Sequence, residues 1–496
     1  MKKLLTDEQM RAFLTQGFLV LKADLPREQH LDIRNRVVDA LEKTHGNPGN
    51  NILPLVPEMQ QVFDSPVVSG ALTSVLGSRY FMHPHRYMHP NANSAGGGWH
   101  KDSYWGYQNR VRNHRPWWVM IMYYPQDVVS ADGPTGVVPG SHCHEKLDPE
   151  LRDQSATTVT GEAGTCFMIQ YDIWHSATRN TSGVNRQMCK FEFMRLEAPD
   201  ASNSPAWNSQ ESEWRDPAQL PPLPHRGLWR QSWNFLRGKP AAPHAKLAEL
   251  NGRSVAALTS SDPRARMTAA DELENCGPAA ISALPQLTAL LGDEYEPACI
   301  NAAYAIAAIG APALPAMAQA LKGDNERASL SATYALATMN TVAVPVLLEA
   351  IAGASPRART HAAFALGEIS GTNGDVIGAL ARAIHDGESR VRLHAVEALS
   401  MKGAAAQKAV PALIDALRDS DTEVRFNAAL AIARLGPVAA EAVAPLKTAL
   451  SDPDRYVRGY AVEALHQIGT KEAFEVLIPF LKTARWCTTT TVASPF

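Results

Sequence analysis

The 496-residue sequence lacks a surplus of charge of either sign. It has 47 lysines and arginines against 50 aspartates and glutamates, and its pI is about 6.6. Proteins that bind nucleic acid or an anionic membrane surface generally carry a basic excess or a basic patch. The balanced composition therefore argues against nucleic acid and against a membrane as partners.

Long apolar segments are also missing from the sequence. No apolar run approaches the roughly 20 residues that a membrane-spanning helix needs. Near the N-terminus, Lys2 and Lys3 are followed by only two leucines before Thr6, so there is no apolar core of the length found in signal peptides. Thr6 followed by Asp7, Glu8 and Gln9 instead predicts a helix N-cap with an acidic first turn. We expect neither a signal peptide nor a membrane span.

Cysteine is scarce, and the six cysteines form no C-x-x-C pair. Paired, regularly spaced cysteines would indicate a disulfide framework or a zinc ribbon, and this sequence has neither. The pattern fits reduced thiols and predicts a cytoplasmic protein. The six residues are Cys143, Cys166, Cys189, Cys276, Cys299 and Cys487.

The chain is too long for one ordinary core, so more than one domain is expected. Composition changes near residue 200, where a segment rich in proline and tryptophan begins. Its prolines indicate an irregular connector, over residues 201–253. Its four tryptophans, at positions 207, 214, 229 and 233, predict that it packs against its neighbours, with a short helix near 228–236. A lid over an active site is the alternative.

Residues 254–484 repeat themselves, with segments such as AAYAIAAIG, AALAIARLG and AVEALHQIG recurring every 30 to 33 residues. A fixed period of helical patterns predicts an all-α solenoid, here of about seven units, followed by a tail over 485–496. The signatures of TPR and ankyrin repeats are absent, and the units resemble HEAT repeats of the short, phycobilin-lyase type. Charged residues 33 apart predict a ladder between units: Arg359, Arg392, Arg425 and Arg458, with Asp386, Asp419 and Asp452.

HEAT-like repeats also build the deoxyhypusine hydroxylases, which bind two irons through His-Glu pairs. No histidine of this solenoid is followed by glutamate, so a metal site of that kind is not expected there. The solenoid is instead expected to bind a protein partner, to buttress the first domain, or to mediate self-association.

The candidate catalytic and metal-binding residues are concentrated in the first 200 residues. In the segment GGGWHKDSYW, His100 and Asp102 point to the same side if the chain is extended. His175 ends an apolar segment, a turn follows at 180–183, and a return strand carrying Arg186 predicts a hairpin that brings this arginine to the same face. Two imidazoles and one carboxylate on one face of a metal are typical of non-haem Fe(II) oxygenases. Arg186 suits the far carboxylate of a dicarboxylate cosubstrate.

With these residues and the segment DGPTGVVPGSH at 132–142, residues 1–200 resemble the phytanoyl-CoA dioxygenase-like family of Fe(II)/2-oxoglutarate-dependent oxygenases. The resemblance implies a double-stranded β-helix, a jelly-roll or cupin-like fold, with His100, Asp102 and His175 as metal ligands and catalytic residues. It implies Arg186 as the 2-oxoglutarate anchor. Because halogenases of this kind replace the carboxylate ligand with a small residue, Asp102 argues against halogenation.

Further residues are weaker candidates, each with a structural alternative. Relatives often place a serine or threonine near the distal histidine to hold the cosubstrate; here Ala177 has the nearest position, flanked by Ser176 and Thr178, and Thr178 is the candidate chosen. Trp118 matches a position where the family can contact the cosubstrate, although Trp117 competes with it and both can be core residues. His89 is preferred to its neighbours His85 and Arg86 as a cosubstrate or substrate contact. Tyr104 and Trp105, just beyond Asp102, either line the substrate entrance or pack.

The sequence thus predicts a multidomain enzyme, a jelly-roll oxygenase joined to a HEAT-like solenoid. The resemblance implies Fe(II), 2-oxoglutarate and O2, with oxidation, most simply hydroxylation, of a C–H bond in a small metabolite or natural-product intermediate and release of succinate and CO2. Desaturation and ring formation stay open. The alternatives are a protein hydroxylase whose solenoid recruits its substrate, and a non-catalytic scaffold.

Overall fold

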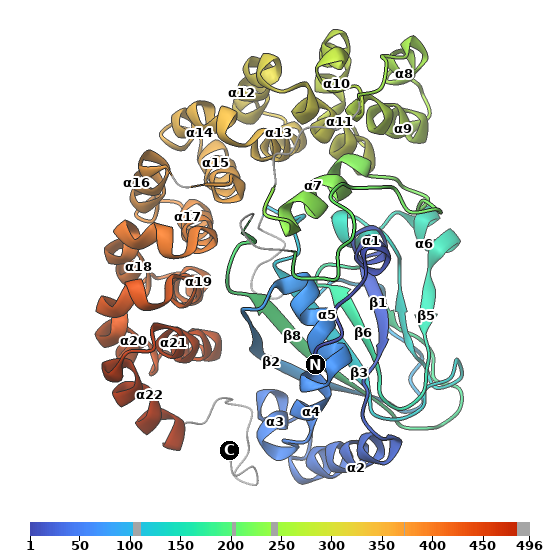
Figure 1. The fold of residues 1–496 in the computed structure, drawn as a ribbon, viewed down its shortest axis with the longest axis vertical. Helices are drawn as coiled ribbons and strands as arrows, with labels where there is room; N and C mark the ends of the chain where they lie inside the picture. The colour runs from blue at the N-terminus through green and yellow to red at the C-terminus, as the bar shows by residue number, and fades with distance from the viewer. Residues whose placement is uncertain (103–110, 201–204, 240–246, 372, 484–496) are drawn as a thin grey trace.

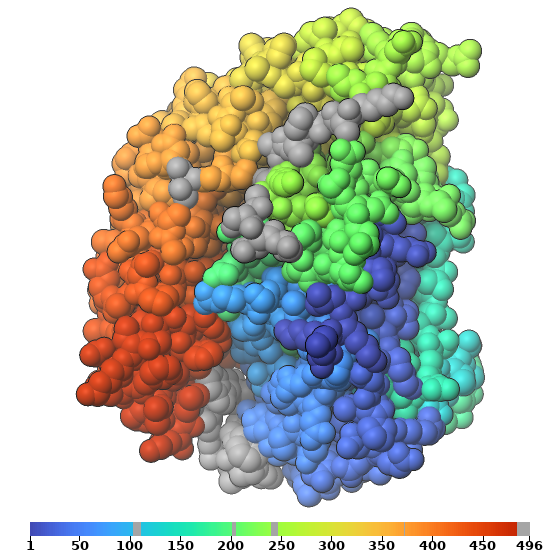
Figure 2. Space-filling model, viewed as in Figure 1, coloured from blue at the N-terminus to red at the C-terminus, as the bar shows by residue number. Residues whose placement is uncertain are grey.

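The computed structural model describes residues 1–102, 111–200, 205–239, 247–371 and 373–483. Tyr104, Trp105 and Cys487 lie outside these ranges. A β-rich part fills the centre of the molecule, and a solenoid of helices curves around one side of it (Figure 1). The β-rich part and the solenoid are in direct contact where they meet (Figure 2).

Two antiparallel sheets face each other in the N-terminal part, which has the predicted oxygenase-like fold. The larger sheet has the strand order β1-β6-β3-β8-β2 and the smaller has the order β5-β4-β7. Apolar side chains such as Met120, Val137 and Phe167 fill the space between them. The strands are β1 (Phe18–Lys22), β2 (Tyr80–Asn91), β3 (Trp118–Tyr124), β4 (Thr135–Val137), β5 (Thr157–Val159), β6 (Thr165–Gln170), β7 (His175–Ala177) and β8 (Arg186–Arg195).

Helices cover the outer face of the larger sheet. Phe63 packs against Phe191 and Phe193, which point outward from β8. The first helix begins as predicted: Thr6 accepts from the backbone N–H of Gln9, and the Gln9 side chain accepts from the backbone N–H of Thr6. These helices are α1 (Asp7–Gln16), α2 (Arg27–Lys43), α3 (Ile52–Leu55), α4 (Met59–Asp64) and α5 (Pro66–Leu76); η1 (Gly49–Asn51), η3 (Ser141–Cys143) and α6 (Pro149–Ser155) lie in loops.

The predicted hairpin between His175 and Arg186 is wrong. The apolar segment splits into β6 in the larger sheet and β7 in the smaller, and β8 then returns to the larger sheet. The turn at 180–183 therefore carries the chain from one sheet to the other. Asn180 fixes this crossover, since its side-chain amide donates to the carbonyls of Asn91 and Val184. Period-2 alternation alone does not reveal which sheet a strand joins.

The connector packs against both parts of the molecule. Its helix α7 (Arg226–Leu236) covers the predicted range. Trp207 and Trp233 are buried in the core between the N-terminal helices and the larger sheet. Trp229 is buried in a separate cluster together with Cys143 and Ile300. Large aromatic surfaces thus tie the connector in place.

Seven helix pairs follow one another in the described part of the solenoid, and the first helix of each pair faces the N-terminal part (Figure 1). The inner helices are α9 (Pro263–Glu274), α11 (Glu296–Ile309), α13 (Glu326–Met339), α15 (Pro356–Glu368), α17 (Ser389–Lys402), α19 (Thr422–Leu435) and α21 (Arg455–Ile468). The outer helices are α10 (Leu284–Leu290), α12 (Leu314–Lys322), α14 (Val344–Ile351), α16 (Gly374–Ala383), α18 (Val410–Ala416), α20 (Val443–Ala449) and α22 (Lys471–Thr483), and α8 (Gly252–Ala257) precedes them.

The predicted charge ladder is present. Arg359, Arg392 and Arg425 each pair with the aspartate 27 residues later, in the loop that enters the next unit. Arg458, in the last pair, donates to the carbonyls of Asp452 and Pro453 of its own loop. The nitrogen–oxygen distances are 2.7 Å for Arg359–Asp386, 2.7 Å for Arg392–Asp419 and 2.9 Å for Arg425–Asp452. These arginines also donate to loop carbonyls, so one side chain fixes the junction between two units.

Two described segments, Glu326–Ile351 and Thr422–Ala449, are long and apolar enough to pass for membrane spans, contrary to the expectation from the sequence. Each consists of an inner helix, a 3-10 turn and an outer helix of the solenoid. Their most apolar windows are 44% and 61% buried inside the protein. Packing in the core of the helical repeats therefore explains why these two segments are so apolar.

The concave face of the solenoid is covered by the N-terminal part of the same chain. Phe81 and Met194 of the sheet belong to the solenoid's own apolar core. Arg434 of α19 is buried in the contact, where it donates to the carbonyl of Arg195 and stacks on Trp117 with its guanidinium 4.8 Å from the ring centre. Of the three roles expected for the solenoid, buttressing is the one that these contacts display.

Replacing Arg434 with alanine is expected to lower the free energy of unfolding by about 3 kcal/mol, because buried charged hydrogen bonds and a desolvated cation–π contact are lost together. Urea unfolding followed by circular dichroism measures the change. Arg418→Ala, at an exposed position of the same solenoid, is the matched control and should stay within about 0.5 kcal/mol of wild type. Equal effects of the two substitutions would contradict the prediction.

Candidate metal centre and adjoining chamber

Three candidate ligands converge at the edge of the smaller sheet. His100 and His175 exchange backbone hydrogen bonds of 3.0 Å in an isolated antiparallel bridge, which places their rings 4.5 Å apart. One ligand atom each from His100, Asp102 and His175 lies within 4.8 Å of the others. Described residues 94–102 form no strand beyond the single bridge at His100, yet they bring the carboxylate of Asp102 to the two imidazoles.

Both imidazoles are held in the orientation that a metal requires. Nδ1 of His100 lies 2.9 Å from the carbonyl of Gly98, and Nδ1 of His175 lies 3.1 Å from the carbonyl of Ile173. A carbonyl only accepts, so each Nδ1 carries a proton, and in the neutral imidazole Nε2 is the nitrogen left to bind a metal. Hydrogen bonds of this kind commonly orient metal-binding histidines. The donor set and its supports therefore fit a ferrous ion.

Lys190, a residue that sequence reasoning missed, lies beside this trio. Its buried ammonium donates to Oδ2 of Asp102 at 3.2 Å. Burial by itself would raise the pKa of Asp102, but Lys190 and His175 outweigh it and the pKa is lowered. For His175, burial outweighs the attraction of Asp102 and lowers the pKa. Both groups are thus in the forms that bind metal, carboxylate and neutral imidazole.

A signal for Lys190 was present in the sequence. Along the apolar strand β8, Arg186, Lys190 and Glu192 occupy even positions, on the face opposite to that of Phe191 and Phe193, which pack against the helices. Charged residues on the inner face of a buried strand are costly unless they are paired or functional. Alternation along this strand could therefore have identified the lysine.

Arg186 is buried four residues before Lys190 on the same strand. Its guanidinium donates to the carbonyls of Gly133 and His89 at 2.7 to 3.2 Å, which fixes its direction. Nε2 of His89 is buried and has no hydrogen-bond partner among the described residues. Burial lowers the pKa of His89 to about 3, so its ring is neutral. An arginine held rigid beside a polar atom without a partner suits the binding of a dicarboxylate.

Two weaker candidates are placed differently from expectation. The hydroxyl of Thr178 donates to the carbonyl of Pro134 at 2.6 Å and is already occupied. Trp118 pairs with Met194, at the opposite end of β8 from Arg186, and packs on Tyr171. The strand register, which the sequence does not reveal, separates Trp118 from the anchor.

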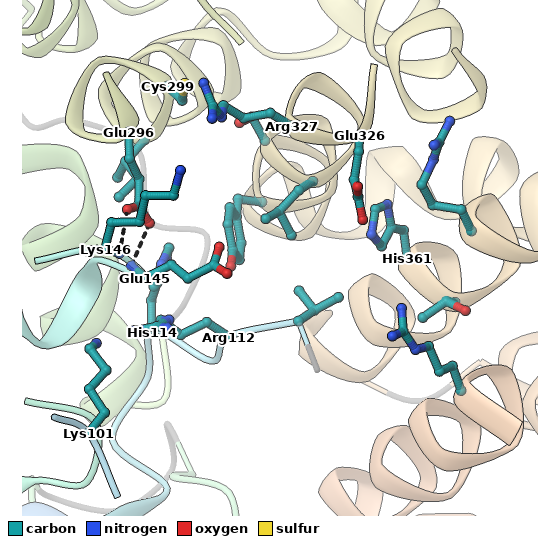
Figure 3. Close-up of a pocket in the computed structure, with 18 of the residues that line it drawn as sticks. Lys101, Arg112, His114, Glu145, Lys146, Glu296, Cys299, Glu326, Arg327 and His361 are labelled. Atoms are coloured by element: carbon teal, nitrogen blue, oxygen red, sulfur yellow. Dashed lines mark hydrogen bonds between the residues drawn. The ribbon is translucent and has the colours of Figure 1, made fainter. Parts of the chain in front are cut away.

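A cavity of about 1180 Å³ opens beside His100, between the N-terminal part and the solenoid (Figure 3). Lys101, Arg112 and Glu145 line one side, and Glu326 and Arg327 of α13 line the opposite side. None of the described connector residues lines it, so the lid has no support from this geometry. We call this cavity the chamber.

The chamber wall is rich in charge, and several of its groups already have partners in the protein. Glu296 accepts from the backbone N–H groups of Glu145 and Lys146, and Arg112 pairs with Asp172. Arg357 is only partly engaged, since its Nη2 donates to the carbonyl of Gly323 while its Nε is buried with no hydrogen-bond partner among the described residues. The solenoid residues of the wall had no signal in the sequence, because repeat periodicity does not show what faces the concave surface.

Comparison with protein families assigns both parts of the chain. Residues 4–188 match the phytanoyl-CoA dioxygenase (PhyH) family. Residues 344–419 and 410–493 match HEAT repeats. Uncharacterized proteins from Mycobacterium tuberculosis and Mycobacterium bovis are each 38% identical over 78 residues, which is 16% of this chain and 29% of each relative. The match thus spans less than a third of those proteins.

Solved structures are more distant. EctD from S. alaskensis with bound iron is 16% identical, with 44% of this chain and 86% of that chain covered and a TM-score of 0.33. HygX from Streptomyces hygroscopicus with iron is 16% identical, with 39% and 87% covered and a TM-score of 0.32. Both identities and both TM-scores are too low to assign a role to this chain. The family matches show that the chain carries a phytanoyl-CoA dioxygenase domain and, after it, HEAT repeats.

Proposed function

We propose that the protein is an Fe(II)- and 2-oxoglutarate-dependent oxygenase that oxidises, most simply hydroxylates, a C–H bond of a small organic metabolite. One observation carries the proposal: His100, Asp102 and His175 bring one ligand atom each within 4.8 Å of the others, and a backbone carbonyl holds Nδ1 of each imidazole. The family match over residues 4–188 supports the same reaction class. Free thiols at all five described cysteines support a reducing, cytoplasmic setting.

The proposed roles follow from the contacts. Bound iron, with 2-oxoglutarate and O2, would supply the oxidising power, and the cosubstrate would leave as succinate and CO2. His100, Asp102 and His175 would hold the metal on one face, and Lys190 would keep Asp102 ionised and oriented. Arg186 would grip the far carboxylate of 2-oxoglutarate, because its guanidinium is fixed by two backbone carbonyls.

The chamber supports a small, charged substrate. Its volume of about 1180 Å³ slightly exceeds the range of roughly 300 to 1000 Å³ found for typical ligand pockets. A folded protein substrate would have to displace the oxygenase domain from the solenoid's concave face, where Arg434 and Tyr456 make buried contacts. We therefore prefer a metabolite or natural-product intermediate, bound with one wall provided by the solenoid, to a recruited protein.

Anaerobic addition of Fe(II) and then 2-oxoglutarate to the apo protein is expected to produce a weak visible charge-transfer band. His175→Ala should lose this band, because one of three ligands is gone. His385→Ala, at an exposed histidine of the solenoid, should keep it. A folded, iron-loaded wild type without the band would overturn the proposal and favour a scaffold.

Arg357→Ala is expected to raise the KM for a substrate with an anionic group at least about tenfold, with little change in kcat, because the lost contact acts on binding and lies away from the reacting atoms. Substrates found by succinate release would be used for the measurement. Arg382→Ala, on the outer helix α16, is the control and should leave KM unchanged. An unchanged KM for Arg357→Ala would remove this residue from the substrate site.

A further inference from the structure

A second cluster of metal-binding side chains lies away from the catalytic trio. One ligand atom each from Cys143, His144 and His225 lies within 4.8 Å of the others, and all three residues are buried. Nε2 of His144 lies 2.7 Å from Nε2 of His225. The sequence did not mark these residues as metal ligands. Cys143 and His144 are neighbours, but His225 is 81 positions from His144 and no spacing pattern links it to them.

The cluster occupies the junction of three parts of the chain. Cys143 ends η3 in the oxygenase domain, and His225 precedes α7 in the connector. Asn301, on α11 of the solenoid, accepts from Nδ1 of His225 at 2.6 Å. A metal ion here would join the oxygenase domain directly to the connector and, through Asn301, to the solenoid.

The contacts of Asn301 fix the protonation of His225. The Asn301 amide nitrogen donates to the carbonyls of Pro224 and Met267, so its oxygen is the atom that faces His225. An oxygen only accepts, and Nδ1 of His225 therefore carries the proton. Its Nε2 keeps a lone pair directed at His144. A hydrogen bond from the far ring nitrogen is the usual support of a metal-binding imidazole.

The surroundings of His144 and Cys143 bear on metal binding. Without a metal, His144 must place its proton on Nε2 to bond His225, which leaves its Nδ1 buried with no hydrogen-bond partner among the described residues. Lys101 and Arg112 both donate to the carbonyl of His144 and lower the pKa of the Cys143 thiol, although burial dominates and raises it to about 12. Their positive charges partly offset the cost of a buried thiolate.

We propose that Cys143, His144 and His225 bind one divalent metal ion that holds this junction together, and that their sulfur and nitrogen donors suit zinc, with a water molecule in the fourth tetrahedral position. Binding would release the thiol proton of Cys143 to solvent and move the His144 proton from Nε2 to Nδ1. The metal would replace the histidine–histidine hydrogen bond. It would tie the connector to the oxygenase domain, independently of catalysis at His100, Asp102 and His175.

Cobalt(II) binding tests the proposal, because a thiolate ligand gives cobalt an intense near-ultraviolet charge-transfer band that nitrogen and oxygen ligands do not give. The full-length His175→Ala protein is used, so that the catalytic trio is disabled. One equivalent of Co(II) should produce the band, and one equivalent of Zn(II) should abolish it. Cys143→Ser in the same background should lose the band while remaining folded by circular dichroism.

A second substitution keeps the test decisive if Cys143→Ser fails to fold. Asn301→Ala removes the support of His225 and leaves all three ligands, so it should weaken Zn(II) binding about 10- to 100-fold in competition with a chelator. His385→Ala, at an exposed solenoid histidine, should bind zinc as the parent does. A folded parent protein that gives no thiolate–cobalt band would overturn the proposal and leave the two histidines as a metal-free pair.

Discussion

Deleting residues 254–496 is expected to yield an N-terminal fragment that aggregates and does not form a stable oxygenase domain. The deletion would expose Phe81, Val111, Met194 and Leu196, which are buried in the solenoid's core. Exposure of a large apolar side chain costs about 1.5 to 3 kcal/mol, so four of them cost roughly 6 kcal/mol or more. That is comparable to the whole stability of many domains.

Polar losses add to the apolar ones. Asn113 and Arg115 would lose Glu368, and the buried ring of His85 would lose the hydroxyl of Tyr456, which lies 2.7 Å from its Nδ1. Soluble yield, size-exclusion chromatography and thermal melting measure the outcome. Deletion of residues 471–496 is the control, because α22 packs on the neighbouring helices α20 and α21. A monomeric fragment of residues 1–253 that melts cooperatively near the full-length temperature would contradict the prediction.

Acid is expected to destabilise the folded protein strongly between pH 6.5 and pH 4. Burial lowers the pKa of His85 to about 4, and that of His142 and of His361 to about 3. The unfolded chain, with histidine pKa values near 6.5, binds more protons across this range. Stability is therefore fully present above pH 6.5 and falls as the pH decreases. At pH 5 each such histidine should cost about 2 kcal/mol.

Urea unfolding at pH 7 and at pH 5 tests this pH dependence. His361→Gln removes one titrating group and keeps an amide that can bond the Ser329 hydroxyl, which lies 2.9 Å from Nδ1 of His361. The variant should lose about 2 kcal/mol less than wild type between the two pH values. His385→Gln, at an exposed position, should behave as wild type does. Identical pH profiles for all three proteins would show that His361 is not held neutral.

The interpretation of the repeats succeeded because it depended on local periodicity. The spacing of apolar residues predicts the inner and outer helices. Arg359, Arg392 and Arg425 pair with the predicted aspartates because each unit repeats the same geometry. The candidate metal-binding trio was also accessible, since His100 and Asp102 are two residues apart on an extended segment. The fold then had to bring His175 beside His100, which it does through the isolated bridge between them.

Residues that approach each other through strand register could not be foreseen in the same way. Trp118 was expected near the cosubstrate but lies at the far end of β8 from Arg186. The hairpin expected after His175 is a crossover between two sheets. A register or a sheet assignment depends on contacts between segments distant in sequence, and local alternation is equally compatible with several of them.

By itself, the sequence determined the two-part architecture, the candidate ligand types and their order, because each of these depends on short-range spacing. Only the tertiary structure decided that Lys190 supports Asp102, that Cys143 meets His225, and that the solenoid's concave face encloses the chamber. The physical reason is the same in each case. Packing selects one arrangement of distant segments from many that the local pattern allows, and the selection depends on burial and hydrogen bonding across the whole chain.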